Sequence, residues 1–230
     1  MQNLSHAVMS QRTESLDSPD DFPTPPWATR ALLECVLHDR EGISDQSCLE
    51  PACGAGHMSD VLAAYFKTLE SSDAYPYGFG TIRDFLEQPY EPNSYDWVIT
   101  NPPFRLAEAF VCEALKVARV GVAILARTVF LESVGRYKGI FLNRPPSRFA
   151  QFVERVPMVK GRLDGKATTA TGYAWFIWEH DFMGPSMLQW VPPCRRSLEK
   201  EDDYQNRPID LDNQIRVGRS VGFGQGSRVR

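Results

Sequence analysis

The fold is best predicted from the stretch Cys48-Leu49-Glu50-Pro51-Ala52-Cys53-Gly54-Ala55-Gly56-His57-Met58. It places an acidic residue and two glycines between an apolar strand, expected at 46–50, and a helix, expected at 57–68. Glycines at a strand-to-helix turn let the backbone approach a ligand closely. The spacing differs from the dinucleotide-binding fingerprint, because no third glycine follows at the required distance.

The rest of the chain continues this alternation of strands and helices. Further helices are expected at 28–38, 104–118 and 130–139, and further strands at 70–80, 95–100, 120–126, 149–156 and 172–179. This order predicts an α/β fold with a mostly parallel, doubly wound sheet and helices on both faces. Ligands of such sheets bind beyond the carboxyl ends of the strands, where both glycines are expected.

A second turn, Asn101-Pro102-Pro103-Phe104, follows the strand-like run Tyr95–Thr100. Proline fixes φ and has no N–H to donate, so this turn does not continue into a helix. It presents two acceptors, Asn101 Oδ1 and the Pro102 carbonyl, beside the flat ring of Phe104. That arrangement suits a planar amine such as the exocyclic NH2 of a base, although an ordinary proline-rich turn can have the same sequence.

The two turns in this order resemble the S-adenosylmethionine-dependent DNA adenine-N6 methyltransferases, and among them phage and prophage enzymes. The resemblance runs from Asp21 to Glu179 and implies a Rossmann-like methyltransferase fold. Its late aromatic strand is Thr171-Gly172-Tyr173-Ala174-Trp175-Phe176-Ile177-Trp178. The residues that it implies for binding S-adenosylmethionine are Thr24, Pro25, Glu50, Pro51, Ala52, Gly54, Gly56, Asp73, Asp84, Phe85 and Asn101.

The resemblance also implies a catalytic turn made of Asn101, Pro102, Pro103 and Phe104. Adenine in a duplex must be flipped out, or the DNA must be single-stranded, before its N6 amine can reach this turn. Phe104 would stack on one face of the base and Tyr173 or Trp175 on the other. Strand alternation places 173, 175 and 177 on one face, so at least one of the two late aromatics is expected in the core. Asp96, which precedes the turn, is interpreted as a residue that supports the structure of the turn and not as one that abstracts a proton.

Composition is consistent with one sizeable core in 230 residues. We expect a flexible arm at 1–20, a catalytic domain at 21–192 and a mobile tail at 193–230. No run of about eighteen apolar residues and no signal peptide is visible, which predicts a soluble, cytoplasmic protein without a membrane partner.

The five cysteines form no CxxC pair, so neither a disulfide framework nor a metal site is expected. Cys53 lacks a neighbouring pattern that would activate it as a nucleophile.

Charge is distributed unevenly along the chain. The net charge is −4, but residues 1–100 hold five Lys/Arg against sixteen Asp/Glu, whereas residues 127–166 hold nine against three. A basic stretch after the catalytic turn favours a polyanion as partner, although a solvated surface would give the same pattern. The expected nucleic-acid contacts are Arg144, Arg148, Lys160, Arg162 and Lys166.

Three functions remain open at this point. Methylation of adenine in DNA is favoured by the N-terminal Pro-Thr-Pro-Pro-Trp element and the late aromatic strand. The same catalytic turn would serve an RNA base or a protein glutamine, and an inactive nucleic-acid-binding relative is the third possibility. The short cationic loops suit phosphate contact more than base reading, which predicts relaxed sequence specificity unless the 195–230 tail or a second subunit supplies recognition.

Overall fold

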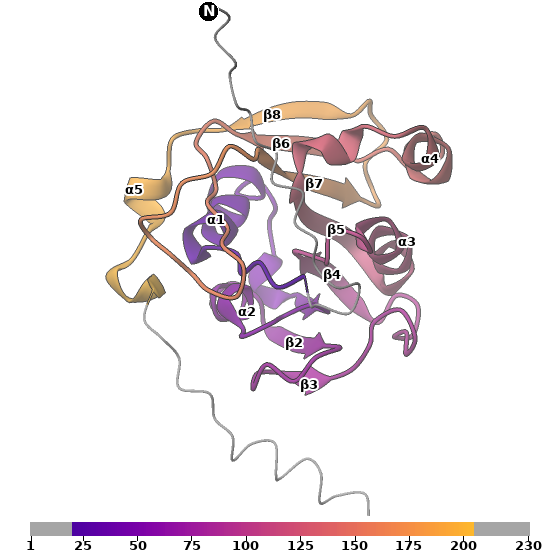
Figure 1. Cartoon of the computed structure of the whole chain (residues 1–230). Coiled ribbons are helices and arrows are strands. Elements are labelled where there is room, and N and C mark those ends of the chain that lie inside the picture. The colour runs from indigo at the N-terminus through magenta and orange to yellow at the C-terminus, as the bar shows by residue number, and fades with distance from the viewer. Residues whose placement is uncertain (1–19, 205–230) are drawn as a thin grey trace, which may run out of the picture.

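The computed structural model describes residues 20–204 (Figure 1). The arm expected at 1–20 therefore lies outside the described residues except for Asp20, and so does the part of the expected tail from 205 onward. The strands are β1 (Ser47–Glu50), β2 (Thr68–Asp73), β3 (Thr81–Ile82), β4 (Tyr95–Thr100), β5 (Ala118–Arg127), β6 (Arg148–Phe152), β7 (Tyr173–Glu179) and β8 (Met187–Val191).

The helices are mostly short. The α-helices are α1 (Pro26–Ala31), α2 (His57–Leu62), α3 (Ala107–Val117), α4 (Val134–Arg136) and α5 (Arg195–Leu198). Single π-helical turns form η1 (Leu32–Val36) and η4 (Tyr137–Phe141), and 3-10 turns form η2 (Ile43–Asp45), η3 (Thr128–Leu131) and η5 (Glu201–Tyr204).

The strands form one eight-stranded sheet in the order β3-β2-β1-β4-β5-β7-β6-β8. β7 is antiparallel to both of its neighbours, and the other neighbouring pairs are parallel. Chain order reverses between β1 and β4, and a crevice at such a switch point is where open α/β sheets bind ligands. The expected doubly wound, mostly parallel sheet is confirmed.

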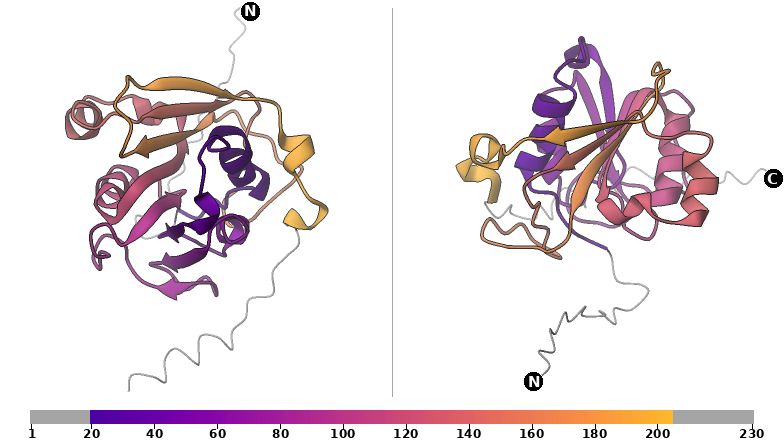
Figure 2. Two further views of the ribbon diagram at one scale, coloured as in Figure 1. Left: turned by 180° about the vertical axis from the view of Figure 1, so that it is seen from behind. Right: turned by 90° about the horizontal axis from the view of Figure 1, so that it is seen from above.

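Helices cover both faces of the sheet (Figure 2). On one face α1, η1 and α2 pack against Trp97, Leu125 and Trp175. On the other face α3 packs against Val122 and Phe176. Both faces of β7 are therefore covered, and all seven of its residues are buried.

Several helix boundaries differ from the sequence prediction: the helix expected at 130–139 is divided into η3, α4 and η4, the helix expected at 28–38 spans 26–36 as α1 and η1, and turns shorten the helices expected at 57–68 and 104–118. α2 ends at Leu62 and not at 68, since the next amides donate at shorter spacing, as Tyr65 N does to Leu62 O at 3.0 Å. α3 begins at Ala107 and not at 104, because the prolines impose a turn in which Leu106 N donates to Pro103 O at 2.9 Å.

The expectation of a mobile tail from 193 onward is wrong for residues 193–204. These residues form α5 and η5, which lie beside α1. The carboxylate of Asp203 accepts two hydrogen bonds from the Arg30 guanidinium, at 2.8 Å and 2.7 Å, and both residues are buried. A polar composition concealed this packing, because only Cys194 and Leu198 pack against the apolar core, and the other contacts are polar ones such as the hydrogen bonds from Cys194 N and Arg195 N to Glu154. Strand β8 was also not predicted.

Candidate active site

A pocket lies beyond the carboxyl ends of β1, β2 and β4, with an empty volume of about 910 Å³ that includes its open mouth. Most residues expected to bind the cofactor line it. They are Thr24, Glu50, Pro51, Ala52, Gly54, Asp73, Asp84, Phe85 and Asn101, together with Pro103 of the catalytic turn. Pro25 and Gly56 do not line it: Pro25 precedes the first turn of α1, and Gly56 precedes the first turn of α2.

The glycine turn has the backbone geometry that the sequence predicted. Gly54 has φ +50° and Gly56 has φ +83°, in the left-handed region that favours glycine. A Cβ on Gly56 would lie 2.6 Å from the ring of Phe79, so this position excludes a larger residue. A Cβ on Gly54 would meet only Asp21 Oδ1, at 3.9 Å, and would otherwise point into open space. Gly56 therefore maintains the turn, while Gly54 keeps the pocket open.

Asp73 ties this turn to the end of β2. Its two carboxylate oxygens accept hydrogen bonds from Gly54 N and Tyr75 N, each at 2.9 Å. Burial raises the pKa of Asp73 despite these donors. Asp21 lies nearby, and its pKa is raised by burial and by the charge of Asp73. The pocket thus concentrates negative charge, which favours a cationic ligand.

Two further acidic residues are held in the pocket wall by fixed hydrogen bonds. The Ser59 hydroxyl donates to buried Glu50, and Ser59 also pairs with the Ser71 hydroxyl at 2.7 Å. Asp84 Oδ1 accepts Leu86 N at 2.9 Å, which positions the loop that carries Phe85. These contacts orient the acidic side chains in the pocket before any ligand arrives.

Asn101 follows β4, and its carboxamide is held from one side by the segment before α1. Asn101 Nδ2 donates to the Phe22 carbonyl at 2.9 Å and to Thr24 Oγ1 at 3.1 Å, and lies 3.7 Å from Met158 Sδ. Its Oδ1 is buried and has no hydrogen-bond partner among the described residues. Within those residues no hydrogen bond engages the Pro102 carbonyl either. The structure therefore leaves both predicted acceptors unused.

Phe104 does not line the pocket, although its neighbour Pro103 does. Its backbone N–H donates to Asp20 Oδ2 at 2.8 Å. Its ring is 5.1 Å from the Phe22 ring and 6.4 Å from the Tyr173 ring, centroid to centroid, and the Arg127 guanidinium lies 4.1 Å from its centroid. The structure thus brings Phe104 and Tyr173 together, as the sequence predicted for a base-stacking site.

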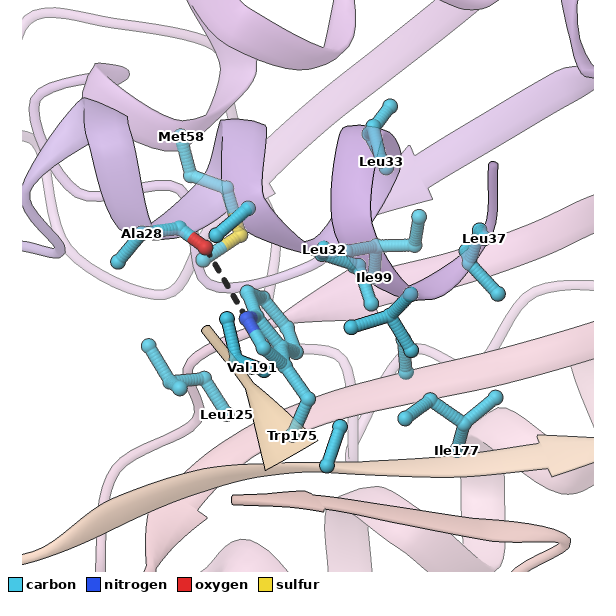
Figure 3. Close-up of a cluster of buried hydrophobic side chains, with 14 of the residues drawn as sticks. Ala28, Leu32, Leu33, Leu37, Met58, Ile99, Leu125, Trp175, Ile177 and Val191 are labelled. Carbon is cyan, nitrogen blue, oxygen red and sulfur yellow. Dashed lines mark hydrogen bonds between the residues drawn. The ribbon is translucent and has the colours of Figure 1, made fainter. Parts of the chain in front are cut away.

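Trp175 does not take part in this group, and its predicted stacking role is corrected here. Its side chain is fully buried, and its indole N–H donates to the Ala28 carbonyl at 3.1 Å, among Leu32, Met58 and Leu125 (Figure 3). It shares a face of β7 with Tyr173, but lies one pleat deeper in the sheet, beneath α1. Trp175 is therefore a core residue.

The five predicted cationic contacts separate into two groups. Arg148 binds Glu179 at 3.0 Å and Asp39 at 3.1 Å, and Glu179 lies at the opposite end of β7 from Tyr173. Arg144 lies near that same end, where its carbonyl accepts the Trp178 indole N–H at 2.9 Å. Neither residue is near Phe104, because β7 runs antiparallel and carries the chain away from the Asn101–Phe104 turn.

The second group, Lys160, Arg162 and Lys166, lies in the loop between β6 and β7. Gly161 N donates to the Asp21 carbonyl at 2.9 Å, which places this loop beside the segment that covers Asn101. Arg162 forms an exposed ion pair with Asp164 at 3.2 Å. Topology therefore brings this loop to the pocket side of the sheet.

Asp96 and Cys53 were considered in the sequence analysis for roles beside the turns, and their contacts in the structure show what surrounds each of them. The Asp96 carboxylate accepts Arg119 Nε at 2.6 Å and Ser47 N at 2.8 Å, at the start of β4 and away from Asn101. Burial opposes ionisation, but the hydrogen bonds from Arg119 and Ser47 outweigh it and lower the pKa of Asp96. Burial raises the pKa of the Cys53 thiol, which disfavours the nucleophilic thiolate.

Sequence reasoning did not select several residues of the site. Asp20, Phe22, Tyr75 and Tyr77 line the pocket, and Arg127 contacts Phe104. Arg127 could have been found, because it ends the apolar strand β5 and therefore lies at the same sheet edge as Asn101. Tyr75 and Tyr77 carry no such signal, since their positions depend on the course of an irregular loop.

The described part of the chain holds neither a candidate metal cluster nor a candidate membrane span. Within residues 20–204, no group of three or more His, Cys, Asp or Glu side chains could hold a metal ion. No helix in that range is both long and apolar enough to cross a membrane.

Solved structures with a similar fold include S-adenosylmethionine-dependent methyltransferases. A type I restriction-modification methyltransferase subunit from Streptococcus thermophilus superposes with a TM-score of 0.58 at 11% identity, over 86% of this chain and 52% of that one. A class I S-adenosylmethionine-dependent methyltransferase from Listeria monocytogenes, itself assigned provisionally, gives 0.54 at 11% identity, over 79% and 69%. An RNA methyltransferase of similarly provisional assignment from Pyrococcus horikoshii gives 0.53 at 14% identity, over 73% and 93%.

No model of a known protein family matches the sequence, and no curated protein matches it. The structural likeness defines the fold, which is that of the class I S-adenosylmethionine-dependent methyltransferases. The chain spans about half the length of the Streptococcus subunit.

Proposed function

We propose that this protein transfers a methyl group from S-adenosylmethionine to the N6 amine of adenine in DNA. The observation that carries the proposal is the Asn101 carboxamide, whose Nδ2 is held by Phe22 and Thr24 while its buried Oδ1 has no partner among the described residues. An unsatisfied buried acceptor costs about 1–3 kcal/mol, so such groups usually have a function. A substrate amine supplies the missing donor.

The pocket residues fit S-adenosylmethionine, which carries a positive sulfonium and amine, a ribose diol and an adenine. Glu50, Asp73 and Asp84 supply oriented carboxylates, and Gly54 leaves open space beside them. The sulfonium supplies an electrophilic methyl group with a neutral thioether as leaving group. Burial raises the pKa values of both Asp21 and Asp73, and for Asp21 it outweighs the charge of Lys160, so a cationic ligand would stabilise the ionised carboxylates further.

The chemistry follows from the two unused acceptors. The N6 amine is a poor nucleophile, because its lone pair is delocalised into the ring. Asn101 Oδ1 and the Pro102 carbonyl accept its two hydrogens, which favours a pyramidal nitrogen with its lone pair directed at the methyl group. These hydrogen bonds strengthen as positive charge develops on the nitrogen, so they stabilise the transition state more than the ground state. No general base is needed, since the proton becomes acidic only after methyl transfer.

DNA is favoured over the other substrates by the surroundings of the turn. Phe104 offers a partly exposed ring to an extruded base, with the buried Tyr173 beside it, and the cations of the loop at 160–166 lie on the same side of the sheet. The Streptococcus likeness is to a restriction-modification methyltransferase subunit. The loop is short and cationic, so we expect contact with phosphates and a preference of at most two to four bases.

Methylation of an RNA base is the second candidate, favoured by the likeness to the Pyrococcus protein. The same turn would also accept a glutamine amide. An inactive relative is disfavoured, because the expected residues Glu50, Gly54, Asp73 and Asn101 are all present in one pocket.

The test is a methyl-transfer assay with deuterated S-adenosylmethionine. Plasmid DNA free of adenine methylation, transcribed RNA and a glutamine peptide are incubated separately with the protein and analysed by mass spectrometry after digestion. We expect labelled N6-methyldeoxyadenosine from plasmid, spread over many sequence contexts. Asn101→Ala should lower the rate by roughly 10² or more, on the scale of losing one oriented transition-state partner. Label in RNA or peptide only, or an undiminished Asn101→Ala rate, would contradict the proposal.

A further inference from the structure

The burial of Trp175 leaves the proposed base site with fewer rings than the sequence predicted. Tyr173 remains, but it is 5% exposed, and its ring is tilted by 39° from that of Phe104. A base that enters beside Phe104 therefore needs another planar partner.

Arg127 supplies a planar group at this place. It is the last residue of β5 and pairs in register with Tyr173, the first residue of β7. Its guanidinium lies over the Phe104 ring, 4.1 Å from the centroid. Strand pairing therefore fixes the Arg127 backbone at the mouth of the site, while its long side chain reaches the ring on which the base is expected to stack.

The guanidinium of Arg127 is not committed to a structural role within residues 20–204. It makes no ion pair there, and the residue is exposed. Arg136, a few residues further on, differs: its guanidinium donates to the carbonyls of Val129, Phe130 and Glu132. The Arg127 guanidinium thus contacts Phe104 through a cation–π interaction, which is weak at an exposed site.

We propose that Arg127 forms the second wall of the base site and stacks on the extruded adenine, which inserts between its guanidinium and Phe104. This inference rests on the proposed function. A base stacked on the aromatic ring of Phe104 is expected to contribute more than the exposed cation–π contact that it replaces. A guanidinium plane is a known stacking partner for unpaired bases, and its charge meets the neighbouring phosphate.

The test separates stacking from phosphate attraction. Fluorescent single-stranded 12-mers, one of deoxyadenosine and one with abasic sites in place of all bases, are titrated with protein in the presence of S-adenosylhomocysteine. Arg127→Ala should weaken binding of the deoxyadenosine 12-mer by roughly tenfold and binding of the abasic 12-mer much less. Arg127→Lys keeps the charge but loses the plane, so it should behave like Arg127→Ala. Arg196→Ala removes an equal charge from the exposed surface of α5 and serves as control.

Equal losses on both 12-mers would overturn the inference, because Arg127 would then contact phosphate only. Unchanged binding by both Arg127 variants, or a wild type that does not distinguish the 12-mers, would overturn it as well. These results leave the proposed function standing if the wild type methylates plasmid. If it methylates no nucleic acid, the proposed function fails with the inference.

Discussion

The candidate site has two halves, the pocket and the aromatic group outside it, and they differ in how their residues are held in place. The cofactor half, from Glu50 to Asp84, is built from strand ends and turns whose backbone is fixed by hydrogen bonds such as Gly54 N to Asp73. The target half combines Phe104, Arg127 and Tyr173, from three different strand ends, with side chains that contact one another only through their rings and a guanidinium. The first half is rigid and acidic, and the second is aromatic and cationic.

This difference teaches which part of a site a motif determines. A turn that needs positive φ at Gly54 and Gly56 has the same geometry wherever it occurs, so its residues can be placed by pattern. The side chains of a late strand are distributed by sheet pairing, and that pairing decides whether an aromatic faces the site or a helix.

The largest effect is expected from Gly54→Leu in the cofactor half. The leucine side chain would occupy the space beside Asp21, and binding of S-adenosylmethionine and S-adenosylhomocysteine should be lost. The wild type should gain about 2–3 kcal/mol of stability at a hundredfold excess of ligand over Kd. Thermal unfolding with and without ligand measures both.

Gly42→Leu is the matched control for this experiment. Gly42 also has positive φ, at +75°, but it lies outside the pocket and its Cβ would meet nothing within 4 Å. The control variant should share the backbone strain and keep the response to ligand. A Gly54→Leu protein that is still stabilised by either ligand would mean that the pocket is not the cofactor site.

A smaller effect, on stability, is expected from Arg148→Ala. This residue hydrogen-bonds Glu179, which is buried, and its removal should cost about 1–3 kcal/mol, because Arg40 remains at 2.8 Å as a second partner of that carboxylate. Urea unfolding measures the cost. The salt dependence of DNA binding should stay unchanged. A flatter dependence would mean that Arg148 contacts nucleic acid, as the sequence predicted.

The loop cations should show the opposite behaviour. Lys160, Arg162 and Lys166 changed together to alanine should weaken DNA binding at low salt and flatten its dependence on salt, by up to about one unit of logarithmic slope for each phosphate that is no longer neutralised. Binding titrations at several salt concentrations, compared with Arg148→Ala, measure this slope. If the triple variant had the same salt dependence of DNA binding as the wild type, this loop would not contact the DNA phosphates.

The smallest effect concerns the pH dependence set by Asp73. Burial raises its pKa above the ordinary 3.8, so the folded protein keeps a proton that the unfolded chain has already lost. Stability therefore falls as the pH rises through the interval between these two values. Asp73→Asn removes this contribution. As the pH rises from about 4, the free energy of unfolding of the variant should therefore increase relative to that of the wild type. Urea unfolding at several pH values measures this free energy for both proteins. A difference between them that does not change with pH would contradict the prediction.

The sequence was sufficient for most of the sheet, although not for β8, and for the glycine turn and the Asn101 turn, because each rests on local chemistry: apolar strands, positive φ and proline. It was insufficient for Trp175 and Arg148, whose roles depend on which face of β7 lies under α1 and on which end of β6 meets Glu179. Period-two alternation correctly predicted that Tyr173 and Trp175 lie on one face of β7. It did not predict that Trp175 lies deeper in the sheet than Tyr173. Long-range pairing, which no short motif encodes, decided those positions.

The Arg30–Asp203 pair sets the minimal length of the folding unit. Composition suggests cutting the chain near residue 192, yet that cut would remove Asp203 and leave the buried Arg30 guanidinium without its carboxylate. Breaking a buried pair from one side costs about 3–5 kcal/mol, a large share of the 5–15 kcal/mol that a typical domain has. Arg30 lies on α1, directly after the segment that holds the Asn101 amide. A shortened protein should therefore lose the ordered Asn101–Phe104 turn together with its stability.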